Sequence, residues 1–248
     1  MDAANPTTIS QRYEHILERI ATAARKSNRQ AEEIQLVVVT KLHPAVSIRE
    51  VITAGARHLG ENYADQALPK IDELRDLPGI HWHMIGHVQS RKAGIVAKAF
   101  DFIHSLDSLK LAEKLDRYSA QYTKKLPVLL ELNVSGEGSK SGFKAWHEAG
   151  WQELVPDLAK ILALPNLEVR GLMTMAPYFD MPEQARPYFR KLVSKQAALQ
   201  KLFPGTNWNE LSMGMSGDFE VAIQEGATIV RIGTSIMGPR QVSGTVEY

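Results

Sequence analysis

A lysine follows a short apolar run near the start of the chain, and its position there could support covalent chemistry. Residues 36–39 read Leu-Val-Val-Val and are followed by Thr40 and Lys41. Three of the four apolar residues are β-branched, which favours a strand buried on both faces. An ammonium group that loses hydration at the end of such a strand has a lowered pKa, and its neutral amine condenses with aldehydes. The alternative is that Lys41 reaches the rim of the sheet and extends into water.

Two glycine-containing stretches late in the chain have the composition of anion-binding loops. The first runs from Ser212 to Asp218 and includes Ser216, and the second, residues 231–235, reads Arg-Ile-Gly-Thr-Ser. Glycines let the backbone approach an anion, and the N–H groups of a helix N-terminus bind phosphate. For the first stretch the alternative is an ordinary strand-to-helix turn capped by Ser216 or Asp218. For Arg231, whose side chain is expected to point inward, the alternative is an ion pair with a neighbouring carboxylate.

A site with an amine at one end and an anion-binding loop at the other suits one kind of ligand, an aldehyde that carries a phosphate. Pyridoxal 5′-phosphate (PLP) fits this description, with an imine on Lys41 at one end and Gly233 and Thr234 at the other. A metal site is a weaker interpretation, because His81 and His83 lie two apart on one expected strand without a further matched ligand. We expect His83 to pack against a flat ligand ring or to be a satisfied core histidine, and we expect no metal.

The composition of the chain excludes several classes of protein. The 248 residues include no cysteine, so disulfides, thiolate zinc sites and a cysteine nucleophile are excluded. A formal net charge of +1 gives no reason to expect a nucleic-acid partner. No apolar run approaches the ~18 residues of a membrane helix, and residues 1–10 lack the apolar region of a signal peptide. We therefore expect a cytoplasmic protein without a membrane partner.

Eight strand-like segments alternate with helical segments after a first amphipathic helix over residues 7–27. The expected strands are 36–41, 57–62, 80–86, 100–106, 127–134, 167–175, 211–215 and 228–233. The expected helices between them are 47–54, capped by Ser47, and 63–74, 91–99, 108–122, 145–164, 182–203 and 218–225. This alternation predicts an α/β fold with a parallel sheet, and eight units predict a closed (β/α)8 TIM barrel.

We expect residues 1–248 to form a single barrel domain with an extra N-terminal helix. The rival architecture is an open doubly wound sheet, but no Gly-x-Gly-x-x-Gly follows the first strand. In a barrel the site lies at the C-terminal ends of the strands. Lys41, Asn62, His83, Ser212 and Arg231 all fall at such ends.

Seven motifs occur in order and span nearly the whole chain. They are Val-Val-Val-Thr-Lys-Leu-His-Pro (37–44), Gly-Glu-Asn-Tyr (60–63), His-Trp-His-Met-Ile-Gly (81–86), Asn-Val-Ser with Lys-Ser-Gly (133–135 and 140–142), Arg-Gly-Leu-Met (170–173), Ser-Met-Gly-Met-Ser-Gly-Asp (212–218) and Arg-Ile-Gly-Thr-Ser-Ile-Met-Gly (231–238). In these motifs the chain resembles the YggS/PROSC family, the pyridoxal phosphate homeostasis proteins. That family is similar to the N-terminal barrel of alanine racemase, which is PLP fold type III.

The resemblance implies a PLP site made by residues from most of these motifs. They are the imine lysine Lys41, the phosphate contacts Ser212, Ser216, Gly233 and Thr234, the pyridine-nitrogen partner Arg231, and the ring-lining residues Asn62 and His83. The chain departs from the family pattern in three places. His43 stands where a second lysine is usual, Arg91 replaces a common asparagine and Met237 a common phenylalanine. No role in cofactor exchange is therefore carried over to position 43.

We expect a PLP-binding carrier or regulator of vitamin B6 and amino-acid balance rather than an enzyme, and we assign no catalytic residue. An arginine only donates hydrogen bonds, so Arg231 would keep the pyridine nitrogen unprotonated and the ring a weak electron sink. In alanine racemases the second base comes from a partner subunit of a two-domain dimer, and this chain has no room for a second domain. We therefore expect a monomer that contacts PLP-dependent apoenzymes transiently.

Three alternatives to the carrier remain open at the level of the sequence. The first is a weak PLP-dependent amino-acid racemase. The second is a sugar-phosphate lyase that uses Lys41 as an imine lysine without a cofactor. The third is a regulatory module that acts mainly by binding another protein.

Overall fold

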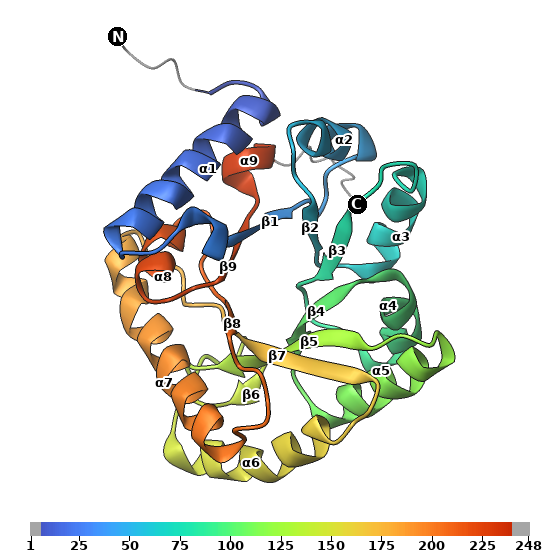
Figure 1. Ribbon diagram of the computed structural model, residues 1–248, viewed down its shortest axis with the longest axis vertical. Helices are drawn as coiled ribbons and strands as arrows, with labels where there is room; N and C mark the ends of the chain where they lie inside the picture. The colour runs from blue at the N-terminus through green and yellow to red at the C-terminus, as the bar shows by residue number, and fades with distance from the viewer. Residues whose placement is uncertain (1–5, 240–248) are drawn as a thin grey trace, which may run out of the picture.

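Eight parallel strands close into a barrel in the computed structural model, which describes residues 6–239 (Figure 1). The strands are β1 (Gln35–Val39), β2 (His58–Glu61), β3 (His81–Met84), β4 (Phe102–Leu106), β5 (Leu126–Asn133), β7 (Leu167–Met173), β8 (Glu210–Ser212) and β9 (Ile229–Ile232). Each strand pairs in parallel with its neighbours in this order, and β9 pairs with β1 through Leu36 and Val230. The predicted closed (β/α)8 barrel is confirmed over the open sheet.

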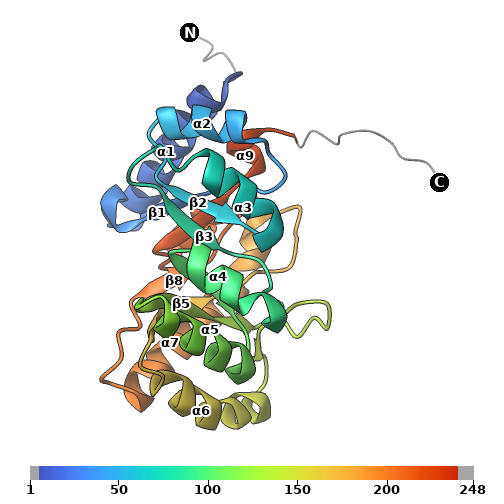
Figure 2. The same ribbon diagram turned by 90° about the vertical axis from the view of Figure 1, so that its right-hand side faces the viewer.

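Helices cover the outside of the barrel between successive strands. They are α2 (Ala45–Thr53), α3 (Ala64–Glu73), α4 (Ala93–Ala99), α5 (Leu109–Gln121), α6 (Glu148–Leu162), α7 (Arg186–Leu202) and α8 (Phe219–Gln224), with short 3-10 turns η1 (Ala31–Glu33), η2 (Ser90–Lys92) and η3 (Pro182–Ala185). Figure 2 shows α2 to α6 stacked along one flank. The predicted cap of the first of these helices is wrong, because Ser47 lies inside α2 and Pro44 is its N-cap. None of the helices within residues 6–239 has the length and apolar character that crossing a membrane requires.

The extra N-terminal helix, α1 (Ile9–Lys26), completes the outer layer. Within residues 6–239 the last strand is followed by α9 (Thr234–Met237), a single turn that was not predicted and that is too short to cover the gap between β9 and β1. Helix α1 packs against α8, α9 and α2 and fills that gap. Arg12 Nε donates to Ile236 O over 2.6 Å, and this bond ties α1 to the C-terminal end of α9.

A ninth strand, β6 (Phe143–Lys144), lies in the segment that we predicted to be a loop. It pairs in parallel with the end of β5, where Leu132 faces Phe143, and it is not one of the barrel strands. A strand of two residues carries no periodicity, so no pattern in the sequence indicates it.

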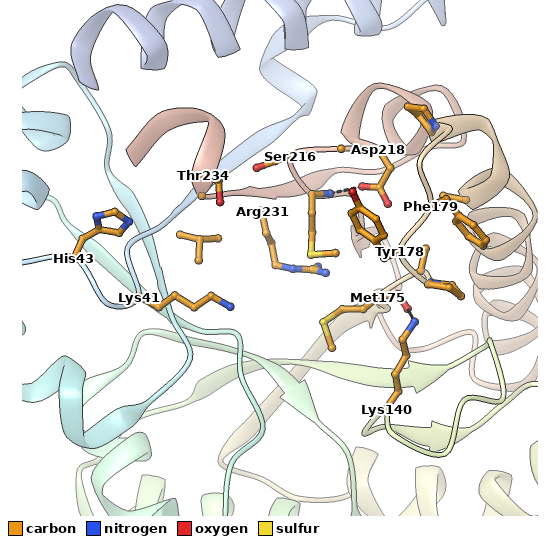
Figure 3. A pocket seen from close by; sticks show the side chains of 18 residues that line it. Lys41, His43, Lys140, Met175, Tyr178, Phe179, Ser216, Asp218, Arg231 and Thr234 are labelled. Carbon is orange, nitrogen blue, oxygen red and sulfur yellow. Dashed lines mark hydrogen bonds between the residues drawn. The ribbon is translucent and has the colours of Figure 1, made fainter. Parts of the chain in front are cut away.

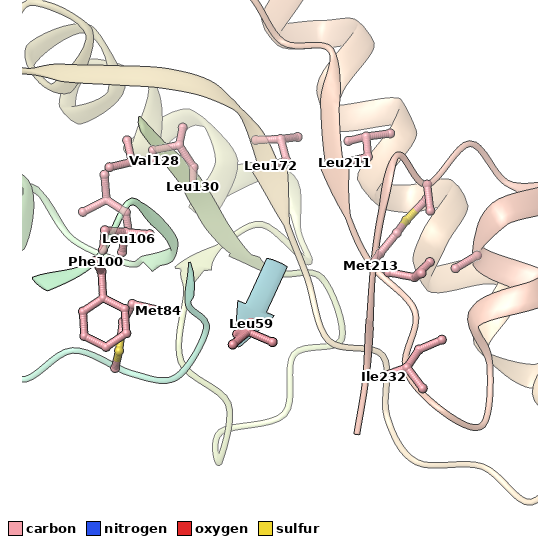
Figure 4. Packing of buried hydrophobic residues seen from close by; sticks show 14 of the residues in the cluster. Leu59, Met84, Phe100, Leu106, Val128, Leu130, Leu172, Leu211, Met213 and Ile232 are labelled. Atoms are coloured by element: carbon pink, nitrogen blue, oxygen red, sulfur yellow. The ribbon is translucent and has the colours of Figure 1, made fainter. Parts of the chain in front are cut away.

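The two faces of the strands differ strongly in polarity. Side chains alternate along each strand, and the outward-facing ones pack against the helices in one large apolar cluster that includes Leu59, Met84, Leu130, Leu172 and Ile232 (Figure 4). The inward-facing apolar cluster is small and consists of Val37, Phe102, Leu129, Met173 and Ile229. Most barrels fill this space with branched apolar residues. Here the same strands also carry buried histidine, serine, glutamate and arginine side chains, and these lead to the site.

Candidate functional site

A cavity of about 620 Å³ opens at the C-terminal ends of the barrel strands. Its walls come from the segments that follow β1, β7, β8 and β9, with one side chain from the loop between β5 and β6. A volume of this size accommodates a small-molecule ligand. In Figure 3 the side chain of Lys41 enters from one side, Ser216 and Thr234 lie along another, and Tyr178 and Phe179 lie opposite Lys41.

Lys41 reaches the cavity from a turn and not from the strand itself. Strand β1 ends at Val39, two residues earlier than predicted, and His43 N donates to Thr40 O over 3.1 Å to close the turn. Leu42 has a φ of 64° in this turn, a left-handed conformation that a branched side chain rarely adopts. Strain of this kind is often found next to functional groups. The half-buried Lys41 is thereby aimed into the cavity.

A buried ion pair fixes the position of this turn. Glu61, the last residue of β2, accepts from Thr40 Oγ1 over 2.7 Å and from Lys70 Nζ over 2.5 Å. Lys70 on α3 also donates to Thr40 O over 3.2 Å. The side chain of Glu61 is fully buried and that of Lys70 is 12% exposed, so each charge depends on the other for compensation. The residue that precedes Lys41 is therefore anchored at both its hydroxyl and its carbonyl group.

The opposite part of the cavity presents hydroxyl groups at the starts of two short helices. Ser216 lies in the turn before α8, which is closed by Met215 N donating to Asp218 Oδ1 over 2.6 Å. Thr234 is the first residue of α9, directly after Gly233. The first N–H groups of a helix have no partner within the helix, and with nearby hydroxyl groups they suit an anion.

Glycine is required at one position of the stretch that carries Ser216. Gly214 has a φ of 90°, and a Cβ atom there would lie 2.6 Å from the Cβ of Ala222 on α8. Gly214 O accepts from Arg231 N over 3.0 Å, so this close approach also connects the loop to β9. The tight packing places the turn that contains Ser216 against the helix that follows it.

Arg231 places a buried cation at the edge of the cavity. Its side chain points into the barrel from β9, and the residue is 3% exposed. Nη1 donates to Ser212 Oγ over 2.5 Å and Nη2 donates to Thr174 O over 3.0 Å. Burial lowers the pKa of Arg231 to about 10, with Glu131 and Asp218 opposing the shift, so the guanidinium stays charged at neutral pH. These two bonds go to neutral oxygens, and no carboxylate forms an ion pair with Arg231 within residues 6–239.

Five of the residues expected from the sequence line one cavity, namely Lys41, Ser216, Arg231, Gly233 and Thr234. Ser212 is fully buried and reaches the cavity only through its hydrogen bond to Arg231. Asn62 and His83 do not line it. The buried Oδ1 of Asn62 has no hydrogen-bond partner among residues 6–239. His83 is 1% exposed, and both of its ring nitrogens are bonded to other histidines.

Several residues that line the cavity were not expected from the sequence. Lys140 comes from the loop before β6, where its Nζ donates to Met175 O over 3.0 Å and pairs with Glu137 over 2.5 Å. Tyr178 and Phe179 follow β7, and Tyr178 is 91% exposed at the rim. Lys140 belongs to the Lys-Ser-Gly motif at residues 140–142, to which the sequence alone assigned no function. The segment after β7 has no periodic pattern and gives no such signal.

The described part of the chain, residues 6–239, contains no group of three or more His, Cys, Asp or Glu side chains placed to hold a metal ion. The histidines inside the barrel are instead hydrogen-bonded to one another, from His58 to His83 and from His83 to His104.

A parallel barrel with an amine, two hydroxyl groups and a buried cation around one cavity defines a class of small-molecule-binding proteins. The model of the alanine racemase N-terminal domain matches residues 13–241. The pyridoxal phosphate homeostasis protein of Vibrio alginolyticus is 38% identical over 241 residues, which cover 96% of this chain and 100% of the relative. That of Aquifex aeolicus is 39% identical and covers 93% of this chain and 98% of the relative.

Solved structures agree with the sequence matches. PipY of Synechococcus elongatus PCC7942 has been solved without PLP and with PLP bound, at TM-scores of 0.79 and 0.77. In both cases the sequence identity is 37%, over 90% of this chain and 100% of PipY. The chain belongs to the family of pyridoxal phosphate homeostasis proteins, which share the alanine racemase N-terminal domain.

Proposed function

We propose that this chain binds PLP in the cavity at the C-terminal end of the barrel, with the Nζ of Lys41 joined to the aldehyde carbon as an imine. The observation that carries the proposal is that one cavity brings together the amine of Lys41, the hydroxyl groups of Ser216 and Thr234, and the cation of Arg231. The PLP-bound structure of PipY, 37% identical to this chain, supports it. Formation of the imine releases one water molecule, which carries away the aldehyde oxygen and two protons from the Lys41 nitrogen.

The residues present fit the three parts of PLP. Lys41 is the amine for the aldehyde group, and Ser216, Gly233 and Thr234 are the donors for the phosphate group. Arg231 is the partner for the ring nitrogen, and Ser212 Oγ holds Arg231 in place by accepting a hydrogen bond from its Nη1. Asn62 does not line the cavity, so it is proposed to support the ring side of the site and not to contact the ring, and its buried Oδ1 has no hydrogen-bond partner among residues 6–239. His83 is proposed to support the ring side of the site through its hydrogen bonds and not by contact.

A carrier or regulator of PLP suits this site better than an efficient enzyme. When bound, PLP supplies an electron-accepting ring, and its strength depends on a proton at the ring nitrogen. Arg231 has no acceptor atom and is itself a donor, so it favours the unprotonated ring nitrogen. Of the side chains opposite Lys41, Lys140 is already paired with Glu137 and Met175 O. The relatives are named as homeostasis proteins, which supports the same conclusion.

Addition of PLP to the purified protein tests binding directly. We expect a near-visible absorbance band from the imine in the wild-type protein, and its loss in Lys41→Ala. Lys140→Ala is the matched control, because it removes the other lysine that lines the cavity and should keep the band. A protein that stays colourless and shows no affinity for PLP in equilibrium dialysis would contradict the proposal and favour the cofactor-free lyase.

The weak amino-acid racemase is the second candidate, because the family shares the alanine racemase N-terminal domain. Chiral chromatography of amino acids incubated with the PLP-loaded protein separates the two functions. A carrier leaves each enantiomer unchanged over many equivalents of protein. Steady conversion that disappears in Lys41→Ala would establish the racemase instead.

We also propose that the protein acts in the cytoplasm as a monomer that meets PLP-dependent apoenzymes only transiently. Sedimentation of the loaded protein should give the mass of one chain. Mixing it with an apoenzyme should transfer PLP without a stable complex. A dimer in sedimentation would contradict the monomer, and a complex that survives gel filtration would favour the module that acts by binding another protein.

A further inference from the structure

Three imidazole rings form a hydrogen-bonded chain across the barrel interior. His58 Nδ1 lies 2.9 Å from His83 Nε2, and His83 Nδ1 lies 2.9 Å from His104 Nε2. His104 Nδ1 lies 2.9 Å from Ser212 Oγ. The same oxygen accepts a hydrogen bond from Arg231 Nη1. His58 begins β2 at the N-terminal end of the barrel, whereas Arg231 lines the cavity at the other end. This chain of hydrogen bonds therefore connects the N-terminal end of the barrel, here called the barrel floor, to the proposed cofactor site.

The environment keeps these rings neutral. His104 is fully buried and His83 is 1% exposed. Burial lowers the pKa of His83 to about 3 and that of His104 well below its usual value, and the nearby Arg231 adds to the effect on His104. Burial also lowers the pKa of His58. A neutral imidazole has one donor and one acceptor nitrogen, so each ring must take one of two tautomers.

The hydroxyl proton of Ser212 determines the direction in which the hydrogen bonds between the histidines run. Within residues 6–239 the hydrogen-bond partners of Ser212 Oγ are His104 and Arg231. Arg231 can only donate, so the hydroxyl proton of Ser212 finds an acceptor only at His104 Nδ1. His104 then carries its proton on Nε2 and donates to His83 Nδ1. His83 in turn donates from Nε2 to His58 Nδ1.

We propose that His104, His83 and His58 are positioning residues whose hydrogen bonds run one way, from Arg231 toward the barrel floor, with the proton of each ring on Nε2. This order presents a lone pair of Ser212 Oγ to the guanidinium and fixes the direction in which Arg231 faces the cavity. If the chain ran the other way, the Ser212 proton would have no partner in the described residues, at a cost typical of an unpaired buried donor. The effect on PLP rests on the proposed function, whereas the tautomers do not.

Long-range proton–nitrogen NMR of the histidine rings in the ligand-free protein tests the direction without any variant. We expect His83 and His104 to be neutral with the proton on Nε2 at neutral pH. A proton on Nδ1 of His104, or a charged imidazolium at either residue, would overturn the proposal. This measurement does not depend on PLP, so its outcome stands even if the proposed function fails.

Two variants at Ser212, next to Arg231 in the hydrogen-bonded chain, test the positioning role. Ser212→Ala removes the acceptor of Arg231, and we expect it to shift His104 toward a mixture of tautomers. We also expect it to weaken PLP binding by about tenfold and to move the ring-nitrogen resonance of ¹⁵N-labelled PLP. Ser212→Thr keeps the hydroxyl group and should restore both signals.

His81→Gln is the matched control for the chain. His81 lies on the same strand as His83 and stacks on His58 with ring centroids 5.0 Å apart, but its ring is not one of those that join the floor to Arg231. It should leave the His104 tautomer and the PLP resonance unchanged. Equal effects of His81→Gln and Ser212→Ala would overturn the positioning role. Absence of PLP binding by the wild-type protein would instead contradict the proposed function.

Discussion

Glu131 shows how a single buried group can make the stability of this protein depend on pH. It lies on β5, is 3% exposed, and one of its carboxylate oxygens has no hydrogen-bond partner among residues 6–239. Burial, reinforced by Asp107, raises the pKa of Glu131 to about 7, although Arg231 acts in the opposite direction. Its protonated form is therefore favoured in the folded protein relative to the unfolded chain.

The raised pKa predicts a fall in stability as the pH rises. Between the unfolded pKa near 4.5 and the folded pKa near 7 the folded state binds more protons, so the free energy of unfolding decreases across this window. The loss is on the order of 3 kcal/mol. Glu131→Gln mimics the protonated form and should remove this slope. Urea unfolding of both proteins at several pH values measures it, and an unchanged slope in the variant would contradict the assignment.

For individual residues, the sequence predicted which residues belong to the site more successfully than it predicted which residues they contact. Lys41, Ser216 and Thr234 stand next to recognisable strand or helix boundaries, and the structure brings them to one cavity. For His83 the sequence left open a ring contact or a satisfied core histidine, and the structure shows the second; its partners His58 and His104 were not predictable, because they lie on two other strands. Hydrogen bonds between separate strands leave no periodic signal in one sequence.

Among the elements, the turn after β1 depends on a buried pair from β2 and α3. Lys70→Met would leave the fully buried carboxylate of Glu61 without its cation. We expect a loss of about 3–5 kcal/mol in the free energy of unfolding, the range for an uncompensated buried charge. The double variant Lys70→Met/Glu61→Gln removes both charges and should recover most of that loss. Thermal or urea unfolding of the two variants decides this, and equal instability of both would contradict the pairing.

The junction of β9 and α9 should be sensitive to any side chain at position 233. A Cβ atom on Gly233 would lie 3.2 Å from Val39 Cβ and 3.3 Å from Val39 O, on the strand that leads to Lys41. Gly233→Val should therefore displace the proposed phosphate contacts and weaken PLP binding by tenfold or more. Gly205→Val is the matched control, since a Cβ atom there has no neighbour within 4 Å. Equilibrium dialysis measures both, and equal affinities would argue against this phosphate site.

Element lengths explain which parts of the fold the sequence predicted. The long amphipathic helices and the apolar strands have clear periods, and their order alone indicated the barrel. The four residues of α9 and the two residues of β6 are too short for any period. The role of α1 as the outer helix between β9 and β1 also follows only from the closed structure, because it depends on how short α9 is.

For the whole molecule, a ligand that binds only the folded state raises the unfolding temperature. The free energy gained is RT ln(1 + [L]/Kd), about 2.7 kcal/mol at a ligand concentration one hundred times Kd. For a chain of this size we expect an increase of about 5–10 °C with PLP. Lys41→Ala should show a much smaller increase. Differential scanning fluorimetry at several PLP concentrations measures it, and identical increases in both proteins would place PLP away from Lys41.

Borohydride reduction of the PLP-loaded protein, followed by peptide mapping, tests most directly whether Lys41 carries PLP as an imine. Reduction converts an imine into a stable secondary amine, which marks the lysine that carried it. We expect a single pyridoxyl adduct on the peptide that contains Lys41, together with loss of the near-visible band. An adduct on Lys140, or no adduct after reduction of a protein that demonstrably binds PLP, would contradict an imine on Lys41.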